Sequence, residues 1–563
     1  MKYEEEFAMK TDPIVRLISR ILLLFAISIT IVFIINSCHP LGNEAGSKPN
    51  IILIMADDMG FSDPGFMGSG IQTPAIDRLA QNGLVFNQFY NAGRCCPTRA
   101  SLMTGLYAHN TGLGWMTAAD HGRPGYRGAI SQHCVTIAEV LGNIGYATYM
   151  TGKWHLVYEP NMEADGDKKN WPLQRGFDKY FGMLAGGGGY YKPSTLTYNN
   201  TRICPADGFY LTKAINDSTI SFLEQHLNSG KDQPFFFYVA HYAPHRPLHA
   251  MQEDIQKYKG AFHLGWDHFR QQHYARLKET GLAPDGWKLD SRPDDIPAWD
   301  SINEDDKQLW ECRMEAYAAQ IDRMDQGIAR IINILEAQGE LDNTLIMFLS
   351  DNGGGAASQG PEFFNPEMEG SVGGASFNQS YRRHWAHVSN APFRLYKTYN
   401  HEGGISTPLI VHWPNEIGNP SIVPQQGHVI DLMATLIDMT GANYPEQVNG
   451  ISINELQGMS LLPAFRGETF DRGELFFEHG GNRAVIYGQW KLVAEGSSTE
   501  PYSKEWELYN LSQDRAESKD LIGQYPDIAK ELEEKWNSWA NANNVLPLDG
   551  RGWGVKIRSD INK

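Results

Sequence analysis

Cysteine is scarce in this sequence, with 6 cysteines among 563 residues. They are Cys38, Cys95, Cys96, Cys134, Cys204 and Cys312. Their number is too low for a fold built on disulfides, and their spacing fits no zinc site. Spacing alone assigns no disulfide pairing, so one or two bridges stay open. The length of the chain exceeds that of one ordinary hydrophobic core and indicates at least two domains.

The sequence also lacks a basic patch and an internal repeat. Its formal net charge is −18 at pH 7, which excludes a nucleic-acid partner in the absence of a local basic cluster. This acidity does not choose the substrate, because a small cationic pocket can still attract an anionic molecule.

Long apolar runs are missing apart from one near the N-terminus. Residues Ile21 to Ile35 form an apolar run of fifteen, preceded by Arg16 and Arg20. A spanning helix needs about twenty apolar residues, and this shorter run with a charged flank is typical of a secretory signal. The alternative is an uncleaved anchor helix.

The sequence that follows this run, "IINSC" at residues 34–38, resembles a bacterial lipobox. We therefore expect a signal peptide over 1–37 and a linker over 38–48. The chain would be exported to the bacterial periplasm or cell envelope and lipid-anchored at Cys38, with no other attachment to a membrane.

Apolar runs alternate with helical patterns over residues 49–460. Strand-like runs begin at Asn50, Tyr146, Pro234, Thr344 and Pro408. Helical spacing of apolar residues covers 136–144 and 314–339. This alternation predicts an α/β domain with a large, mostly parallel sheet flanked by helices. Residues 461–563 instead predict a smaller α+β domain, with short amphipathic strands in an antiparallel sheet and one final helix.

Polar side chains stand at the C-terminal ends of four of these apolar runs. They are Asp57, Asp58, Lys153, His155, His245, Asp351 and Asn352. Ligands of open α/β sheets bind beyond the carboxyl ends of the strands, so we expect these side chains to share one pocket.

The two adjacent cysteines belong to a longer motif. The sequence Cys95-Cys96-Pro97-Thr98-Arg99 is followed by Thr104-Gly105. It resembles the C-x-P-x-R signature of type I sulfatases of the alkaline-phosphatase superfamily. The resemblance implies that a maturation enzyme oxidises Cys95 to formylglycine, while Cys96 occupies a variable position. The alternative for two cysteines alone is a buried pair or a strained vicinal disulfide.

The implied aldehyde has a chemical rationale. A serine or cysteine nucleophile would be left holding a sulfate ester that is itself hard to hydrolyse. A hydrated aldehyde carries two hydroxyls on one carbon. One attacks sulfur, and the other loses its proton so that the carbonyl re-forms and sulfate leaves.

Four of the strand-end residues are oxygen donors of the kind that Ca²⁺ or Mg²⁺ prefers. The resemblance assigns Asp57, Asp58, Asp351 and Asn352 to one divalent cation, usually calcium, with the formylglycine oxygen at Cys95 as a further ligand. In isolation, Asp57-Asp58 would more often belong to a solvated turn, and Asp351-Asn352 would more often belong to a tight turn.

The resemblance also assigns the cationic residues. It implies that Lys153 and Lys397 bind the sulfate group, that His155 handles the diol proton, and that Arg99 holds the formylglycine. His245, before a proline, would protonate the leaving oxygen. His241 is the alternative to His245, with a core position as its expected role.

The resemblance runs from about Asn50 to the final helix, so we expect a sulfatase that acts on a small sulfated molecule. The segment 263–302 and the stretch 390–404 look like bacterial arylsulfatases, which favours aryl sulfates. His109, Trp115, Trp154 and His479 are candidates for an aromatic-accepting pocket, although core packing or a surface position is the expected role of any one of them taken alone.

Four alternatives stay open at this point. They are a carbohydrate sulfatase, a phosphodiesterase, a phosphonate hydrolase of the same superfamily, and a lipoprotein that binds sulfated glycans without turnover. One departure from the family pattern, Arg515 where the family often has proline in D-P-x-E, is expected not to affect the chemistry.

The export prediction is tested by expressing the full chain in a bacterium and determining the mass of its N-terminal peptide. We expect a mature chain that begins at an acylated Cys38, and Cys38→Ala should leave the precursor unprocessed. A free N-terminus elsewhere would contradict the lipoprotein assignment, and an intact segment 1–37 would indicate an anchor helix.

Overall fold

The computed structural model describes residues 48–360, 371–497, 501 and 504–546. The predicted signal peptide, Cys38 and almost all of the predicted linker lie outside the described residues. Within the described residues, no helix combines the length and the apolar character that crossing a bilayer needs.

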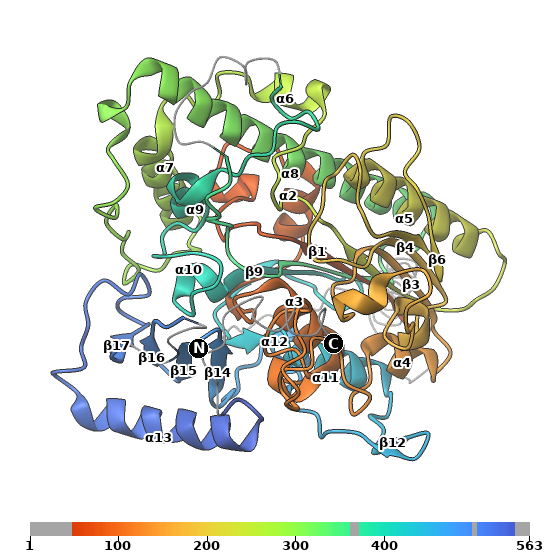
Figure 1. The fold of residues 1–563 in the computed structure, drawn as a ribbon. Helices are drawn as coiled ribbons and strands as arrows, with labels where there is room; N and C mark the ends of the chain where they lie inside the picture. Colours follow the sequence, from red (N-terminus) through yellow and green to blue (C-terminus); the bar gives the residue numbers. More distant parts are fainter. Residues whose placement is uncertain (1–47, 361–370, 498–500, 502–503, 547–563) are drawn as a thin grey trace, which may run out of the picture. The chain divides into compact units, whose positions relative to one another are not determined.

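An 11-stranded mixed sheet forms the centre of the fold (Figure 1). Strand β1 (Asn50–Ala56) lies between β7 (Phe235–Ala240) and β8 (Thr344–Ser350) and is parallel to both. The strand order is β10 (Ser421–Val423), β2 (Leu84–Tyr90), β9 (Ser406–His412), β8, β1, β7, β3 (Ala147–Lys153), β4 (Lys179–Met183), β5 (Leu196–Tyr198) and β6 (Thr201–Arg202), and β11 (Gly427–His428) also pairs with β2. The predicted fold class, with a mostly parallel sheet, is confirmed. The antiparallel pairings involve β9, which is antiparallel to both of its neighbours, and the edge strands β4, β5 and β6.

Strand β1 is buried on both faces, which explains its continuous apolar sequence. Ile52 and Ile54 join one hydrophobic core, whereas Ile51, Leu53 and Met55 join a second core on the other face of the sheet. Helices α2 (Pro74–Gln81), α5 (Leu211–Leu227) and α8 (Glu304–Gln338) cover the first face, and α3 (Cys95–Thr104), α4 (Ile137–Gly142) and α11 (Asp431–Thr440) cover the second (Figure 1).

The remaining helices are shorter or belong to excursions from the sheet. They are α6 (Gln252–Tyr258), α7 (Gly265–Glu279), α9 (Arg382–Ser389), α10 (Glu402–Ile405) and α12 (Leu462–Phe465), with 3-10 turns at 65–67, 108–111, 159–162, 172–175 and 299–301. Helix α8 begins ten residues before the predicted helix because Asn303 caps it, accepting a hydrogen bond from Asp306 N. A two-stranded hairpin joins β12 (Gln447–Val448) and β13 (Ile451–Ser452).

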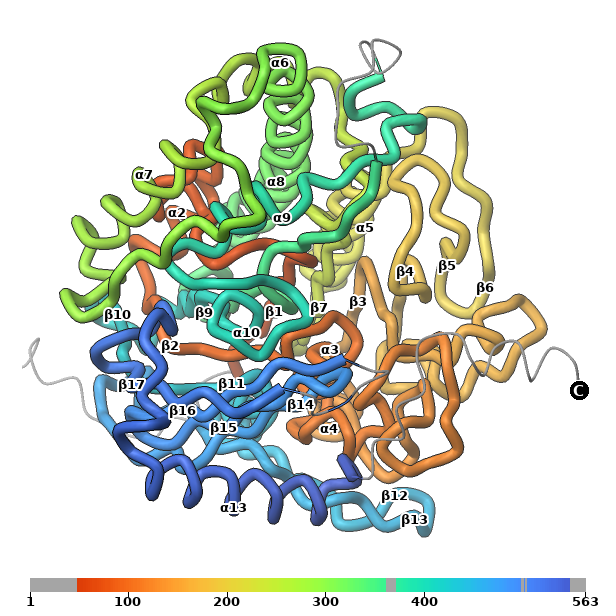
Figure 2. The backbone as a smooth tube through the Cα atoms, turned by 60° about the vertical axis from the view of Figure 1, so that its left-hand side comes forward, coloured from red at the N-terminus to blue at the C-terminus, as the bar shows by residue number. Residues whose placement is uncertain are grey.

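The C-terminal part forms the predicted antiparallel sheet and final helix. Strands β14 (Leu475–His479), β15 (Asn482–Tyr487), β16 (Trp490–Ala494) and β17 (Glu507–Asn510) follow one another in order. Helix α13 (Pro526–Ala542) lies along this sheet (Figure 2) and buries Trp536 and Trp539 against it. The exact boundary at residue 460 stays a prediction, because the described residues from Pro49 onward form one compact unit.

Four fully buried charges join the C-terminal sheet to the large sheet. Lys491 Nζ in β16 lies 2.9 Å from Glu402 Oε1 in α10 and 2.8 Å from Glu517 Oε1. Arg515 Nε donates to Glu402 Oε2 at 2.5 Å. Burial alone would raise the pKa of Glu402, but Lys491 and Arg515 outweigh it and lower the pKa. Arg515, at the departure from the family pattern, thus holds the segment that follows Lys397, a contact that the sequence analysis did not anticipate.

We expect Lys491→Met to lower the free energy of unfolding by about 3 kcal/mol, because it leaves two buried carboxylates with a single cation. Denaturant unfolding measures the change. The control is Lys213→Met, which breaks an exposed pair with Asp217 at 2.6 Å and should cost less than about 0.5 kcal/mol. Equal effects of the two substitutions would contradict the structural role of the buried cluster.

Candidate active site

The carboxyl ends of β1 and β8 place three aspartates together. In the parallel pairing of the two strands Ala56 lies opposite Ser350, so Asp57 and Asp351 leave the sheet side by side. Asp351 N donates to Ala56 O at 3.1 Å, and Asp58 N donates to Asp351 Oδ1 at 3.3 Å. Asp58 adopts a positive φ of 66°, which turns its side chain back toward this group.

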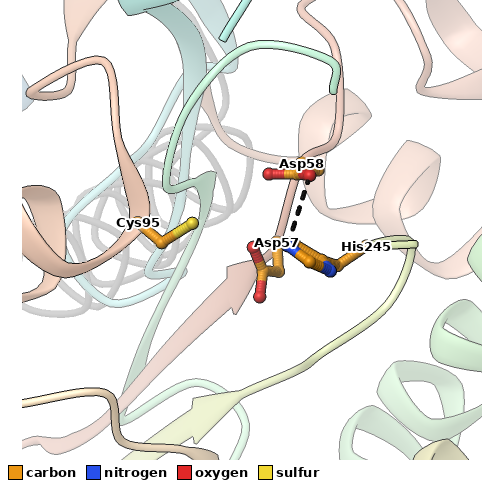
Figure 3. A group of neighbouring side chains, drawn as sticks. All are labelled: Asp57, Asp58, Cys95 and His245. Carbon is orange, nitrogen blue, oxygen red and sulfur yellow. Dashed lines mark ion pairs between the residues drawn. The ribbon is translucent and has the colours of Figure 1, made fainter. Parts of the chain in front are cut away.

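Cys95 is the first residue of α3 and points into the aspartate group. Figure 3 shows its sulfur directed toward Asp57 and Asp58. Lys397 Nζ donates to Cys95 Sγ at 3.0 Å. Burial raises the pKa of the Cys95 thiol, although Lys153 and Lys397 oppose the shift.

Cys96 is oriented away from this group. Its sulfur lies 3.5 Å from Trp115 O and 3.6 Å from the Met116 sulfur. Both cysteines are free thiols, so the vicinal disulfide considered from the sequence does not form in this structure.

Each carboxylate is paired with one cation from another element. The pairs are Lys153 with Asp57 at 2.5 Å, Arg99 with Asp351 at 2.8 Å, and Lys397 with Asp58. Burial would raise the pKa of Asp58, but Lys397 and His245 outweigh it and hold the pKa well below its usual range. The pKa of Asp351 rises to about 6, because burial and the charge of Asp57 outweigh the attraction of Arg99.

His245 faces Asp58 from the opposite side (Figure 3), with 3.6 Å between its Nε2 and Asp58 Oδ2. Its Nδ1 donates to the backbone oxygen of Arg246 at 2.6 Å. A carbonyl oxygen can only accept, so the proton of neutral His245 sits on Nδ1 and Nε2 is left with its lone pair. Burial lowers the pKa of His245 well below its usual value, and the charge of Asp58 acts in the opposite direction.

The other two histidines are both buried but differ in position. The pKa of His155 is lowered by burial and by Lys153, and its Nδ1 has no hydrogen-bond partner within the described parts of the chain. A Cβ atom at Gly186 would lie 2.0 Å from His155 Nε2, so only glycine fits against this ring. Burial lowers the pKa of His241 to about 3. His245, and not His241, joins the ligand group around Asp57 and Asp58.

The site fits a divalent cation. Ligand atoms of Asp57, Asp58, Cys95 and His245 lie within 4.8 Å of one another (Figure 3). Asp57 Oδ1 and Asn352 Oδ1 are buried and have no hydrogen-bond partner among the described residues. Asn352 Nδ2 donates to Asp58 Oδ1 at 2.7 Å, which fixes the amide so that its free atom is an oxygen acceptor. Buried acceptors without donors are rare in proteins, and a bound cation satisfies both.

Of the predicted ligands, Asp57, Asp58 and Cys95 belong to this group, and Asp351 is not among its members. Asp351 faces Arg99, and Asn352 faces Asp58. His245 joins the ligand group, although the sequence analysis assigned it only a proton-transfer role. The sequence gives only a weak signal for this role of His245, because His245 belongs to no metal-binding motif of fixed spacing.

Two of the four predicted pocket residues are buried and make contacts within the protein interior. Trp154 lies in the hydrophobic core, and its Nε1 donates to Asn170 O at 2.7 Å. His109 Nε2 lies 2.7 Å from Glu478 Oε2 in a buried pair. Trp115 and His479 instead stack on each other, with ring centroids 5.1 Å apart and planes at 14°.

Comparison with known proteins gives a consistent result. Residues 49–442 match the Sulfatase family model, and residues 393–542 match the model described as N-sulphoglucosamine sulphohydrolase, C-terminal. An uncharacterized sulfatase of Schizosaccharomyces pombe is 33% identical over 87% of this chain and 93% of its own length. An arylsulfatase of Klebsiella aerogenes is 31% identical over 74% of this chain and 91% of its own.

Solved structures agree with these relatives. The structure of Ps i-CgsB in complex with k-i-k-neocarrahexaose is similar with a TM-score of 0.64 and 25% identity. The similarity covers 92% of this chain and 96% of that one.

We expect Asp57→Ala to lose the divalent cation, because it removes one of the two unpartnered oxygen acceptors and a negative charge. Metal content per chain, measured by mass spectrometry after removal of loosely bound ions, provides the readout. Asp63→Asn is the matched control, since Asp63 is a buried aspartate that lies outside the ligand group, and its Oδ2 accepts from Gly60 N at 2.7 Å and from Tyr317 OH at 2.6 Å. Full metal occupancy in folded Asp57→Ala would refute this ligand.

Proposed function

Because the chain belongs to the sulfatase family and is a sulfuric ester hydrolase, we propose that it hydrolyses sulfate esters with Cys95, converted to formylglycine, as the nucleophile. The observation that carries this proposal is the position of Cys95 beside Asp57, Asp58 and Lys397 at the carboxyl end of the sheet. Membership in the family favours an enzyme over a lipoprotein that only binds sulfated glycans.

The proposal includes one divalent cation held by Asp57, Asp58, Asp351, Asn352 and the modified Cys95. The oxygen donors favour calcium, with magnesium as the alternative. When bound, the cation supplies positive charge that polarises a sulfate oxygen, and the aldehyde at residue 95 supplies a diol that can be re-formed after each turnover.

In the proposal, Lys153 and Lys397 bind the sulfate group. The ammonium group of Lys153 is buried and that of Lys397 is largely shielded, and both pair with carboxylates that are also the proposed ligands of the cation. Arg99 spans the floor of the site: it donates to Asp351 at 2.8 Å and to the backbone oxygen of Lys153 at 2.9 Å. It thereby connects α3 to the carboxyl ends of β3 and β8.

The histidines serve as proton carriers in the proposed mechanism. His245 presents Nε2 to the site, and an anionic sulfate bound beside it would raise its pKa and favour a proton on that atom. Protonated His245 then donates to the leaving oxygen. His155 is buried and neutral, with a free Nδ1, and is suited to accept the proton of the nucleophile.

We propose aryl sulfates as the substrate class. The Klebsiella aerogenes arylsulfatase supports this choice, as does the stacked pair of Trp115 and His479 next to Cys96. A carbohydrate sulfate is the second candidate, because the similar structure of Ps i-CgsB holds a neocarrahexaose. Parallel assays with sulfate and phosphate esters separate the proposed activity from a phosphodiesterase or phosphonate hydrolase.

The location of the protein is part of the proposal. Export and lipid anchoring at Cys38 would place the enzyme in the periplasm or cell envelope. Maturation would require a formylglycine-generating enzyme as a transient partner.

Peptide mass spectrometry of the active enzyme is expected to show formylglycine at residue 95, and Cys95→Ala should abolish sulfate-ester hydrolysis. Cys96→Ala is the matched control: its thiol faces Trp115 O and the Met116 sulfur, so the variant should keep the modification and most of the activity. An unmodified Cys95 in fully active enzyme would contradict the proposed nucleophile.

A further inference from the structure

One arginine beside the nucleophile is left without an acceptor. Arg94 immediately precedes Cys95 and takes an extended conformation at the N-cap of α3, with φ −154° and ψ 148°. Its Nε is buried and has no hydrogen-bond partner in the part of the chain that the structure describes. The other three cations of the site, Arg99, Lys153 and Lys397, each contact a carboxylate.

Arg94 is close enough to Lys397 and His479 for its charge to act on both side chains. Burial lowers the pKa of His479, and repulsion by Arg94 is the next largest cause. Burial and Arg94 also oppose the rise that Asp58 produces in the pKa of Lys397. Two of the groups near Arg94 are therefore a cation, Lys397, and a neutral ring, His479.

An aromatic surface belongs to the same region. His479 ends β14 and stacks on Trp115, which is only partly buried. The turn after β14 lies close against this indole. A Cβ atom at Gly480 would be 2.8 Å from Trp115 Cζ3, which is too close for a side chain. The C-terminal sheet thus supplies one wall beside a partly exposed guanidinium. We call Arg94, Trp115 and His479 the Arg94 subsite.

Arg94 is a positive charge beyond those that the three aspartates of the site require. The three aspartates are matched by three cations, and the reacting sulfate is already served by Lys153 and Lys397 in the proposed function. A guanidinium with a buried, unpaired N–H group loses hydration without compensation until an anion arrives. Its planar fork matches a carboxylate or a sulfate with two parallel hydrogen bonds.

We infer that Arg94 binds a second anionic group on the substrate, a carboxylate or a further sulfate on the leaving group, while the Trp115–His479 pair packs against the ring that carries it. This inference rests on the proposed sulfatase function and narrows its substrate class to sulfate esters with at least two negative charges. The other role open to Arg94 is direct contact with the sulfate that is transferred.

The test compares substrates that differ only in the second charge. The holoenzyme is assayed with 4-nitrophenyl sulfates that carry a carboxylate on the ring and with the methyl esters of the same compounds. We expect wild type to prefer at least one carboxylate over its ester by about tenfold in kcat/KM, which corresponds to about 1.4 kcal/mol. Arg94→Gln should bring this ratio close to one, and Arg94→Lys, which keeps the charge but not the fork, should give an intermediate ratio.

Arg246→Gln is the matched control. Arg246 is an exposed arginine next to His245, but its guanidinium already donates to Gln359 Oε1. We expect this variant to keep the wild-type ratio. The same ratio measured with sugar sulfates, with and without a second sulfate, tells an acidic carbohydrate from an aromatic acid as the source of the anion.

The outcomes separate the inference from the function on which it rests. A wild-type ratio near one for every pair, with sulfate esters still hydrolysed, would overturn the Arg94 subsite alone. An equal loss for both members of each pair in Arg94→Gln would assign Arg94 to the transferred sulfate and also overturn it. Failure of the modified, metal-loaded wild type to hydrolyse any sulfate ester would contradict the proposed function itself.

Discussion

The compensation of three buried carboxylates by three cations is the interaction on which the site depends. Asp57, Asp58 and Asp351 leave adjacent parallel strands with almost no exposure to solvent. Such a group is not tolerated in a protein interior unless each charge is paired. The partners come from α3, the end of β3 and the loop before α10, so the pairing joins elements that are far apart in sequence. The same arrangement leaves Asp57 Oδ1 and Asn352 Oδ1 free for a cation, which links the stability of the fold to its chemistry.

A second set of buried and paired charges connects the site to the C-terminal sheet. Glu402 follows Lys397 by five residues and is held by Lys491 and Arg515. The C-terminal sheet therefore supports the loop that carries Lys397, the lysine proposed to bind sulfate, and it also contributes His479 to the proposed Arg94 subsite. This part of the chain is best understood as a wall of the active site.

Most of the fold could be predicted from the sequence, because strands and their ends are marked by short stretches of neighbouring residues. Continuous apolar runs mark strands that are buried on both faces, and polar residues at their ends mark the ligand-binding edge. The residues that surround Cys95 followed from a motif and a family resemblance, and the structure brings them together. The antiparallel direction of β9 was not predicted, since an apolar run has no direction. The buried positions of Trp154 and His109 agree with the core packing expected for single members of the proposed pocket, but the pairing of Arg515 with Glu402 was missed. These features depend on contacts between distant segments, such as the 2.7 Å hydrogen bond from Asn352 to Asp58 across 294 positions.

The most direct test of the central claim is a crystal structure of the mature, active enzyme at a resolution that distinguishes sulfur from oxygen at residue 95. The account predicts two oxygens on Cβ of residue 95, or one for the unhydrated aldehyde, and a single divalent ion at about 2.3–2.6 Å from oxygens of Asp57, Asp58, Asp351 and Asn352. An intact Cys95 thiol, or full activity with no ion among these residues, would contradict it.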